Sequence, residues 1–519
     1  MKKLLASILA LSMILAMTAC SGGSSSSAGE SSSAPAAPAS SGESSEEPKE
    51  LDKVTFVYMT QNNVPETVDL QRVQGLINDH IRDKIQVEVE LVLFTNADYS
   101  TQLNLRLASN EPADLFRSMN GNPTISYIND GIAMDITDYL DSELKGAVGV
   151  LYDGLLATST VNGRTYGLNV VTSNYVPRGW CYRTDIVEKL QIDLSNVKTI
   201  FDLTEVFAKV KESYPDMVLC DPTRAYVAFQ AYLQDTEHMD PLGGDSSNAF
   251  SGVVFGEDSK VVNAYESDQF KTIANLMRDW YKAGYFPSDA ATSTATTAEM
   301  ASAGNLFSMF AGLGNPKIAS VFTSNYNYSY DCIQISDAYS LSTSYDVWMI
   351  NSGSKAPAAA ARFLNLLYTD ADLHNFITYG EKGVDYELNE DGFVVPPEGY
   401  ESLADVPYTN NLNYPYWGSK WLPYRTLGGL TDEEAEVNKK QNYDALLSSF
   451  YGFVYDYSNV EAEYLAISNI AEEYKKALWV GSLDVDSALQ EMNNKMNASG
   501  LDKVIADKQA QLDEWLAHR

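Results

Sequence analysis

The chain has 519 residues, of which 70 are acidic and 36 are basic, giving a formal net charge of −34. This acidic excess argues against a nucleic-acid-binding protein, since such proteins neutralise phosphates with Lys and Arg, and against broad docking on anionic lipid. Residues 51–519 are too many for one simple core, so we expect two lobes.

The first twenty residues have the pattern of an export signal. Lys2 and Lys3 precede an apolar run, 4–17, that is too short for a stable transmembrane helix but suits a signal peptide. Small residues precede Cys20, as at the cleavage site of a lipoprotein, although Met17 stands where Leu is usual. We predict a signal peptide at 1–19 and lipidation of Cys20, which would attach the chain to a membrane through its N-terminus only. The alternative is an ordinary signal peptide with a chance cysteine.

A disordered tether is predicted at 20–50, where nearly every residue is Ser, Gly, Ala, Pro or Glu. Such a segment cannot bury enough apolar surface to offset its ordering entropy. A folded body on this tether suits the outer face of a cell membrane, with a Gram-positive type of surface as the setting. No later apolar run is long enough to span a bilayer.

The body begins with alternating strands and helices. Apolar positions recur at alternating or at helical spacing along its first part. The expected elements are, in order, a strand at 54–59, a helix at 68–81, a strand at 85–93, a helix at 97–108 and a strand at 113–116. This order predicts an α/β lobe with a parallel sheet, whose ligands bind beyond the carboxyl ends of the strands.

Further elements follow along the chain. We expect a hairpin turn at 162–168, a strand at 175–182, and helices at 185–190, 201–210, 270–283, 357–367, 464–478 and 504–515. Beyond Cys20, the cysteines are Cys181, Cys220 and Cys332, with no CxxC pair. We interpret them first as small apolar residues; a disulfide would leave one thiol free, and the sequence does not select the pair.

Reactive side chains show no catalytic pattern. His80, His238, His374 and His518 are scattered, and there is no HExxH, GxSxG or GxxxxGK[ST] motif. Residues 385–392 superficially resemble a calcium loop but lack its glycine at position six, so an acidic hairpin turn is favoured. We expect no catalytic residue, metal or cofactor. A surface carbohydrate-active enzyme remains an alternative, because 70 carboxylates can include a glycosidase pair.

Several stretches together resemble one protein family. Residues 107–116, 163–168 with 180–185, and 358–372 are similar to the type 1 extracellular solute-binding proteins, the sugar receptors of ABC importers. The tail is similar to the LplA-like lipoprotein subfamily, which has an extra C-terminal region. Its matching stretches are 380–386, 417–423, Tyr474 with Leu478 and Gly481, and Gln511–Leu512 with Trp515.

The resemblance implies a fold and a function. The fold is the type II periplasmic-binding-protein fold: two α/β lobes joined by a multi-strand hinge of about three crossovers, with a helical C-terminal extension. Lobe 1 would hold 51–170 and 326–375, and lobe 2 would hold 171–325 and 376–519. A monomer would close on a sugar, favoured as an oligosaccharide, and deliver it to ABC permease subunits. A glycan-binding adhesin or sensor is a further alternative.

Candidate ligand-binding residues follow from the sheet rule and from sugar chemistry. Gln61, Asn62 and Asn63 follow the first strand, and Arg117 and Ser118 follow the strand at 113–116, where the rule places ligands. Sugars also stack on aromatic rings and bind planar polar side chains. The further candidates of this kind are Arg178, Trp180, Tyr182, Trp348, Trp417 and Trp421. For Trp180 and Trp348 the alternative is a core position, for Arg178 a surface charge, and for the aromatic loop around Trp417 packing between lobes.

Overall fold

The computed structural model describes residues 51–61, 64–119, 124–152, 154–172, 176–243, 250–337, 339–341, 346–410, 417–426 and 429–518. The predicted signal peptide, Cys20, the tether, Asn62 and Asn63 lie outside these residues. None of the helices in the described part of the chain combines the length and apolarity that a membrane-spanning helix needs.

The first sheet is built on β1, a strand buried on both faces along most of its length, as strands of parallel sheets are. β1 pairs in parallel with β2 and with β3, and β15 runs antiparallel to β3 and to β6. The strand order is β2 (Val87–Thr95), β1 (Asp52–Thr60), β3 (Leu115–Arg117), β15 (Val347–Ile350) and β6 (Leu168–Asn169). The predicted strand–helix–strand order and the parallel pairing are confirmed for β2, β1 and β3, but the antiparallel β15 makes the complete sheet mixed.

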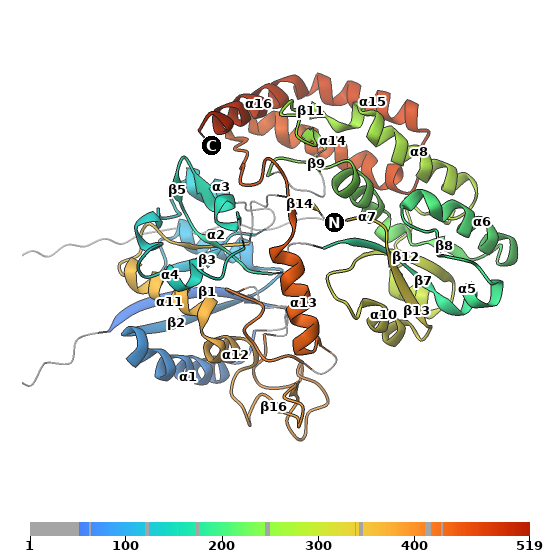
Figure 1. Cartoon of the computed structure of the whole chain (residues 1–519). Helices are drawn as coiled ribbons and strands as arrows, with labels where there is room; N and C mark the ends of the chain where they lie inside the picture. The colour runs from blue at the N-terminus through green and yellow to red at the C-terminus, as the bar shows by residue number, and fades with distance from the viewer. Residues whose placement is uncertain are drawn as a thin grey trace, which may run out of the picture. The chain divides into compact units, whose positions relative to one another are not determined.

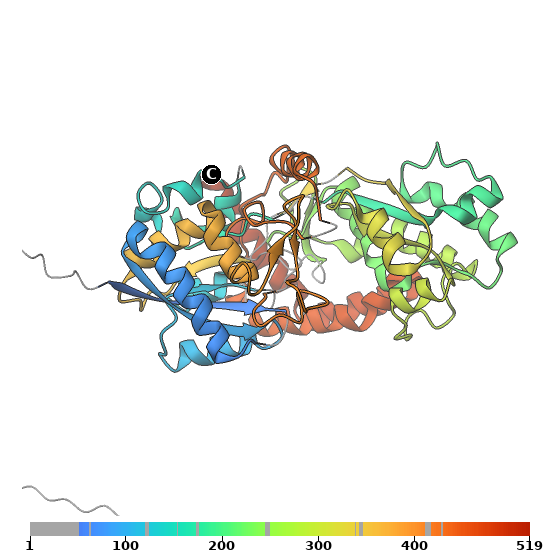
Figure 2. The ribbon, with the colours of Figure 1, turned by 90° about the horizontal axis from the view of Figure 1, so that it is seen from below.

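The helices beside this sheet come from two distant parts of the chain. The blue N-terminal segments and the orange segments near residue 370 lie side by side in Figures 1 and 2, and α1 contacts α12 while α11 contacts β1. Pro357 opens α11, where its fixed φ suits a first helical turn. The helices are α1 (Thr67–Ile85), α2 (Tyr99–Ala108), α3 (Thr124–Asn129), α4 (Lys145–Val148), α11 (Pro357–Thr369) and α12 (Ala371–Tyr379).

The second sheet is mixed. β7 runs antiparallel to both β12 and β13, and β12 runs parallel to β8. The strand order is β13 (Tyr330–Gln334), β7 (Arg178–Arg183), β12 (Leu306–Gly312) and β8 (Val218–Cys220). The surrounding helices are α5 (Thr184–Leu190), α6 (Leu203–Ser213), α7 (Ala225–Phe229), α8 (Asp268–Lys282), α9 (Thr297–Ser302) and α10 (Ile318–Tyr326), with a small sheet of β9 (Met239–Asp240), β10 (Ser251–Phe255) and β11 (Val262–Asn263).

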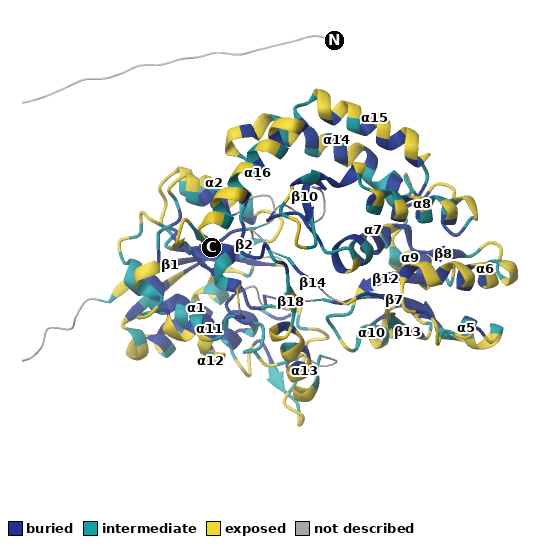
Figure 3. Cartoon of the chain, turned by 45° about the horizontal axis from the view of Figure 1, so that its top comes forward, coloured by how far each residue is buried: buried dark blue, intermediate teal, exposed yellow. Residues whose placement is uncertain are grey.

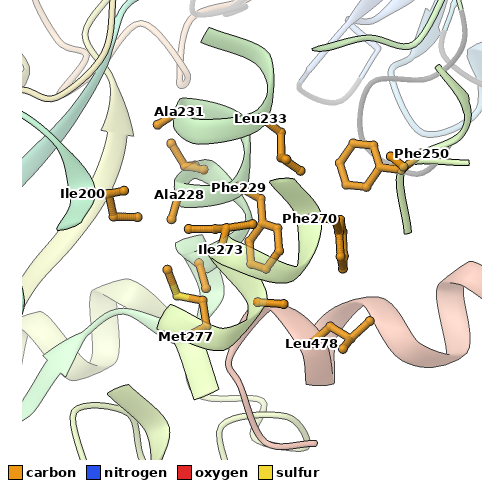
Figure 4. Close-up of a cluster of buried hydrophobic side chains, with 14 of the residues drawn as sticks. Ile200, Ala228, Phe229, Ala231, Leu233, Phe250, Phe270, Ile273, Met277 and Leu478 are labelled. Carbon is orange, nitrogen blue, oxygen red and sulfur yellow. The ribbon is translucent and has the colours of Figure 1, made fainter. Parts of the chain in front are cut away.

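Helix α8 joins this sheet to the C-terminal helices. Ser267 caps its first turn, and its buried stripe includes Phe270, Ile273, Met277 and Trp280 at helical spacing. Figure 4 shows Phe229, Phe270, Met277 and Leu478 gathered into one apolar cluster. The covering helices are α14 (Glu461–Trp479), α15 (Val485–Ala498) and α16 (Leu501–Ala517), and the outer faces of α14 and α15 are exposed in Figure 3.

Gly481 marks the closest approach in this cover. Its φ is +69°, and a Cβ there would lie 2.1 Å from the carbonyl oxygen of Met277 on α8. Only glycine fits this position, so the turn after α14 lies directly against α8. The sequence did not indicate α15, and it placed the start of α14 three residues late.

The two largest clusters of buried apolar side chains define the lobes. We call lobe 1 the part built around the cluster of β1, β3, β15 and α11, and lobe 2 the part built around β7, β12, α8 and α14. Three passages join the two clusters in the described part of the chain, and we call them the first, second and third connections. Their described residues are 172 and 176–179, then 336, 337, 339–341 and 346, and then 418–426 and 429–449. β14 (Tyr339–Ser340) of the second connection pairs with β18 (Leu446–Leu447) of the third.

The lobe boundaries differ from the predicted ones in two places. Tyr330–Gln334 pairs with β7 and belongs to lobe 2, not to the segment that returns to lobe 1. Conversely, Ile377, Tyr408 and Trp417 are buried in the core of lobe 1, although residues from 376 onward were expected in lobe 2. Tyr408 and Trp417 lie in irregular chain, whose partner lobe has no periodic signal in the sequence.

His374 lies fully buried in lobe 1 beside Trp417, with the two ring centroids 6.3 Å apart. Burial lowers the pKa of His374 to about 3. The unfolded chain therefore takes up this proton first as the pH falls, and the stabilising contribution of the neutral ring is lost between pH 6.5 and about 3.

We expect His374→Gln to flatten the acid dependence of stability. Below pH 6.5, the free energy of unfolding should fall less steeply in the variant, by up to about 1.4 kcal/mol per pH unit. Urea denaturation followed by tryptophan fluorescence at several pH values measures this slope. His518→Gln, at an exposed residue after α16, is the control. Equal slopes in the parent and in His374→Gln would contradict the assignment.

Candidate functional site

The carboxyl edge of the first sheet gathers predicted site residues. Gln61 lies exposed just beyond β1, and its backbone N–H donates to the carbonyl of Asn410 at 3.4 Å. Ser118 follows β3 and is fully buried, with its hydroxyl 3.0 Å from that of Thr124 at the start of α3. Gln61 and Ser118 therefore mark the same edge, but only Gln61 exposes its side chain there.

Arg117 is held inside lobe 1. Its side chain is 2% exposed and pairs with Asp346, with Nη1 and Oδ1 2.8 Å apart. Its Nη2 also lies 3.5 Å from the sulfur of Met59 on β1. Asp346 ends the second connection, and its carbonyl accepts a hydrogen bond from the backbone of Val170. Arg117 therefore joins the sheet edge to the second connection, and its guanidinium is not displayed at the surface.

Arg178 is the first residue of β7 and lies near the end of the first connection, where polar side chains of lobe 2 bind its guanidinium. Its guanidinium donates to Asp235 and to Oε1 of Gln234, the latter at 3.0 Å. Ser336, at the start of the second connection, donates to the other carboxylate oxygen of Asp235 at 2.6 Å. Asp235 therefore binds the ends of two connections at once.

Asp235 sits on a π-helical turn, η5 (Gln230–Thr236), which continues α7. π-Helical turns often occur at functional sites. The Asp235 side chain is fully buried; burial raises its pKa, and the facing Arg178 guanidinium and Ser336 hydroxyl oppose the rise. Sequence reasoning singled out Arg178 but not Asp235, Gln234 or Ser336, because none of these follows a recognisable motif.

Three of the four predicted tryptophans are core residues. Trp180 packs on Tyr182 with ring centroids 4.7 Å apart, Trp348 packs against Phe56, and Trp417 lies edge-on to Tyr58. All three tryptophans are at most 1% exposed, so none offers a ring face to a ligand in this structure. Tyr182 is also buried, at 8% exposure.

Trp421 is the exception, since it is only half-buried. Its indole N–H donates to the hydroxyl of Tyr152 at 3.2 Å, and that hydroxyl donates to the carbonyl of Thr172 at the start of the first connection. The ammonium of Lys420 lies 4.2 Å from the indole centroid, and burial lowers the pKa of Lys420 to about 8. The indole edge is thus hydrogen-bonded beside the first connection, and Lys420 lies over the ring.

The segment that carries Trp421 is attached to lobe 1 through its backbone. The N–H of Val171 donates to Gly418, and the N–H of Lys420 donates to Val171, which forms a short parallel bridge. A Cβ at Gly418 would lie 1.6 Å from the carbonyl oxygen of Leu367. Residues 414–416 of the predicted aromatic loop lie outside the described residues.

One group of side chains has the donor types of a metal site. The ligand atoms of His80, Asp370 and Asp372 lie within 4.8 Å of one another. However, the ammonium of Lys84 is 2.7 Å from Asp370 and 2.8 Å from the imidazole Nε2 of His80. Lys84 already supplies the positive charge there, so we assign no metal. Residues 385–395 form the expected hairpin of β16 (Glu387–Leu388) and β17 (Val394–Val395).

The structure shows which two cysteines pair, which the sequence left open. Cys181 on β7 and Cys332 on β13 form a disulfide between directly paired residues of neighbouring strands. Cys220 on β8 is free and buried, and burial raises its thiol pKa, which makes it unreactive.

The chain is similar in sequence to known families and to a characterised type of transport protein. Residues 81–372 match the family described as bacterial extracellular solute-binding protein, and 449–517 match a domain of unknown function (DUF3502). A carbohydrate ABC transporter substrate-binding protein of Streptococcus pneumoniae serotype 4 is 25% identical over 460 residues, which covers 85% of this chain and 87% of that protein.

Solved structures share the fold. The crystal structure of the N-glycan transport solute-binding protein of Streptococcus pneumoniae has a TM-score of 0.72 at 24% identity, covering 90% of this chain and 99% of that one. An HMO-binding, ABC-transporter-associated solute-binding protein of Bifidobacterium longum infantis has a TM-score of 0.62 at 14% identity, with coverages of 90% and 99%. The expected type II binding-protein fold is confirmed. Since the family model spans more than half of its length, the chain belongs to the bacterial extracellular solute-binding protein family.

Proposed function

We propose that this protein captures an oligosaccharide between its two lobes and delivers it to the permease subunits of an ABC importer. The observation that carries the proposal is the alignment, over 85% of the chain, with a relative named as a carbohydrate ABC transporter substrate-binding protein. The family consists of binding proteins, not enzymes, so the ligand is released unchanged.

The placement of the candidate ligand-binding residues on both lobes supports this function. Gln61 and Trp421 lie on lobe 1, and the Arg178–Asp235 group lies on lobe 2, next to the first and second connections. A sugar that touches both lobes binds their closed arrangement better than the open one, and this difference drives closure. Of the predicted aromatic contacts, we retain Trp421 as the surface on which the sugar stacks. We assign Gln61 and Arg178 as polar contacts to the sugar.

The relatives favour an oligosaccharide over a monosaccharide. The Streptococcus pneumoniae N-glycan transport protein has been solved in complex with Man1GlcNAc and with Man5GlcNAc. We extend this ligand class to the present chain as part of the proposal. Lipidation of Cys20, the tether and a monomeric receptor of the LplA-like type complete it, with the protein held on the outer face of the membrane.

A glycan panel tests the proposal. The purified chain is mixed with N-glycan fragments, linear glucan oligosaccharides and the matching monosaccharides, and both the melting temperature and the sugar products are recorded. We expect a rise in melting temperature with an oligosaccharide, because ligand at 100 times Kd adds about 2.7 kcal/mol to the stability of the folded state. Shortened sugars among the products, or shifts with peptides only, would sink the proposal.

Trp421→Ala should weaken binding of the best glycan by about 5- to 150-fold, since a sugar face stacked on the indole contributes about 1–3 kcal/mol. Isothermal titration measures the Kd. Trp421→Phe keeps an aromatic face while losing the bond to Tyr152, and it should recover most of the affinity. An unchanged Kd in the alanine variant would place the ligand elsewhere.

A second role, as a glycan-binding adhesin or sensor, makes the same binding prediction. Transport separates the two. Deleting the gene should abolish uptake of the identified glycan and growth on it, and reintroducing the full chain should restore both. Growth without the gene would favour the adhesin.

A further inference from the structure

Helix α16 lies within the domain of unknown function and binds the backbone of other segments through its glutamines. Gln509 binds a loop of lobe 2: its Oε1 accepts from the N–H of Val261 at 2.7 Å, and its Nε2 donates to the carbonyl of Ser259 at 3.0 Å. Both partners lie between β10 and β11, so Gln509 fastens α16 inside lobe 2 only.

Gln511, two residues later, makes the same pair of bonds to a different segment. Its Oε1 accepts from the N–H of Asp456 at 3.0 Å, and its Nε2 donates to the carbonyl of the same residue at 2.7 Å. Asp456 belongs to residues 450–458, by which the third connection enters the core of lobe 2 and which we call the entry segment. Asn459 and Asp507 add a bond at 3.3 Å just after it.

The entry segment also contacts lobe 1. The side-chain amide of Asn129, the last residue of α3, donates to Oδ2 of Asp456 at 2.7 Å. The other carboxylate oxygen accepts from the N–H of Ser458 at 2.9 Å, which fixes its orientation. A continuous path of hydrogen bonds thus runs from α16 through Asp456 to α3, across the two lobes.

We propose that the C-terminal domain, residues 449–517, restricts the motion of the hinge, and we call this restraint the brace. Gln511 holds the entry segment by two hydrogen bonds to Asp456, and the Asp456 side chain accepts a third from Asn129 of lobe 1. The first and second connections are held together by Asp235 within lobe 2. The third connection pairs with the second through β14 and β18, and α16 adds a further restraint on the entry segment that follows it. A hinge segment ordered before the ligand arrives does not have to be ordered by the ligand, so the brace raises affinity by preorganisation.

The two glutamines provide a matched pair of variants. Gln511→Leu and Gln509→Leu each remove two hydrogen bonds from α16 to backbone, so they cost similar stability, but only Gln511→Leu releases the entry segment. Asn129→Ala, at an exposed residue of lobe 1, tests the tie without altering the C-terminal domain.

The lobe separation is measured first without ligand. Spin labels at Asp79→Cys on α1 and Glu212→Cys on α6, both exposed, report the distance between lobes in a Cys20→Ser background, where Cys220 is buried and the other cysteines are bridged. We expect broader distance distributions for Gln511→Leu and Asn129→Ala, with Gln509→Leu matching the parent. Distributions that match the parent in both of the first two variants would overturn the proposal.

Affinity is the second readout, and this readout alone rests on the proposed function. Gln511→Leu should weaken the Kd for the best glycan by at least about fivefold, the lower end of common coupling energies, while Gln509→Leu stays within about twofold. A chain that binds no sugar but shows the broadened distances would refute the sugar assignment and keep the brace. Equal loss of affinity in both glutamine variants would assign α16 a purely structural role.

Discussion

A chain carrying Cys181→Ser and Cys332→Ser is expected to lose about 2–5 kcal/mol of its free energy of unfolding. The disulfide closes a loop with a sequence separation of 151 residues, for which the chain-entropy relation gives an upper value of about 5 kcal/mol. It also fastens β13, the outermost strand of its sheet, to β7. Urea denaturation of the oxidised parent and of the double variant measures the difference.

Two controls accompany this prediction. Cys220→Ala removes a buried thiol that has no bridge, and it should cost only about 1 kcal/mol. Alkylation of the unfolded, unreduced parent in a Cys20→Ser background should modify Cys220 alone. Three modified thiols would show that the bridge does not form, and the expected loss would then disappear.

Asp385→Asn is expected to cost about 3 kcal/mol, because it removes the buried partner of a part-buried ion pair and leaves the Arg72 guanidinium and two backbone N–H groups facing an amide. Asp385 is fully buried and accepts from both terminal nitrogens of Arg72 on α1, each at 2.8 Å. It also accepts from the N–H groups of Glu381 and Tyr408 at 2.7 and 3.1 Å. The hydrogen bonds from Arg72 to the Asp385 carboxylate are the largest cause that raises the pKa of Arg72 above its ordinary value.

Glu381→Gln is the matched control for this pair. Glu381 contacts the same Arg72 guanidinium at 2.9 Å, but its side chain is 38% exposed, so water replaces the lost charge and the cost should stay below about 1 kcal/mol. Both variants are compared with the parent by denaturant titration. Equal costs for the two carboxylates would show that burial of Asp385 has no energetic consequence.

The fold was predictable where local patterns suffice. β2, α1 and α8 carry apolar periodicities that also set which face is buried, and Pro357 marks the start of α11. The pairing of Cys181 with Cys332 was not predictable, since it depends on the register of two strands 151 residues apart. The π-helical turn at Gln230–Thr236 likewise has no sequence period of its own.

The sequence predicted which edge of the first sheet carries the candidate site residues, but not which of their side chains are exposed there. The sheet rule directed attention to Gln61, Arg117 and Ser118, and the structure places them at the ends of β1 and β3. It did not distinguish displayed side chains from buried ones: Arg117 pairs with Asp346, and Trp180, Trp348 and Trp417 pack inside. Aromatic residues satisfy a core and a sugar face equally well, so only burial separates the two uses.

The cover of lobe 2 by α14, α15 and α16 determines when the molecule can finish folding during synthesis and export. The sheet strands of lobe 2 lie between residues 178 and 334, but their apolar cluster includes Leu478, Met492 and Leu512. Lobe 1 similarly needs Trp417. A polypeptide that emerges N-terminus first can pack the α8 stripe against Phe207, Phe229 and Phe310, but the cluster lacks its C-terminal side chains until the last helices arrive. Translation stopped before residue 461 would yield an aggregation-prone product instead of a smaller receptor.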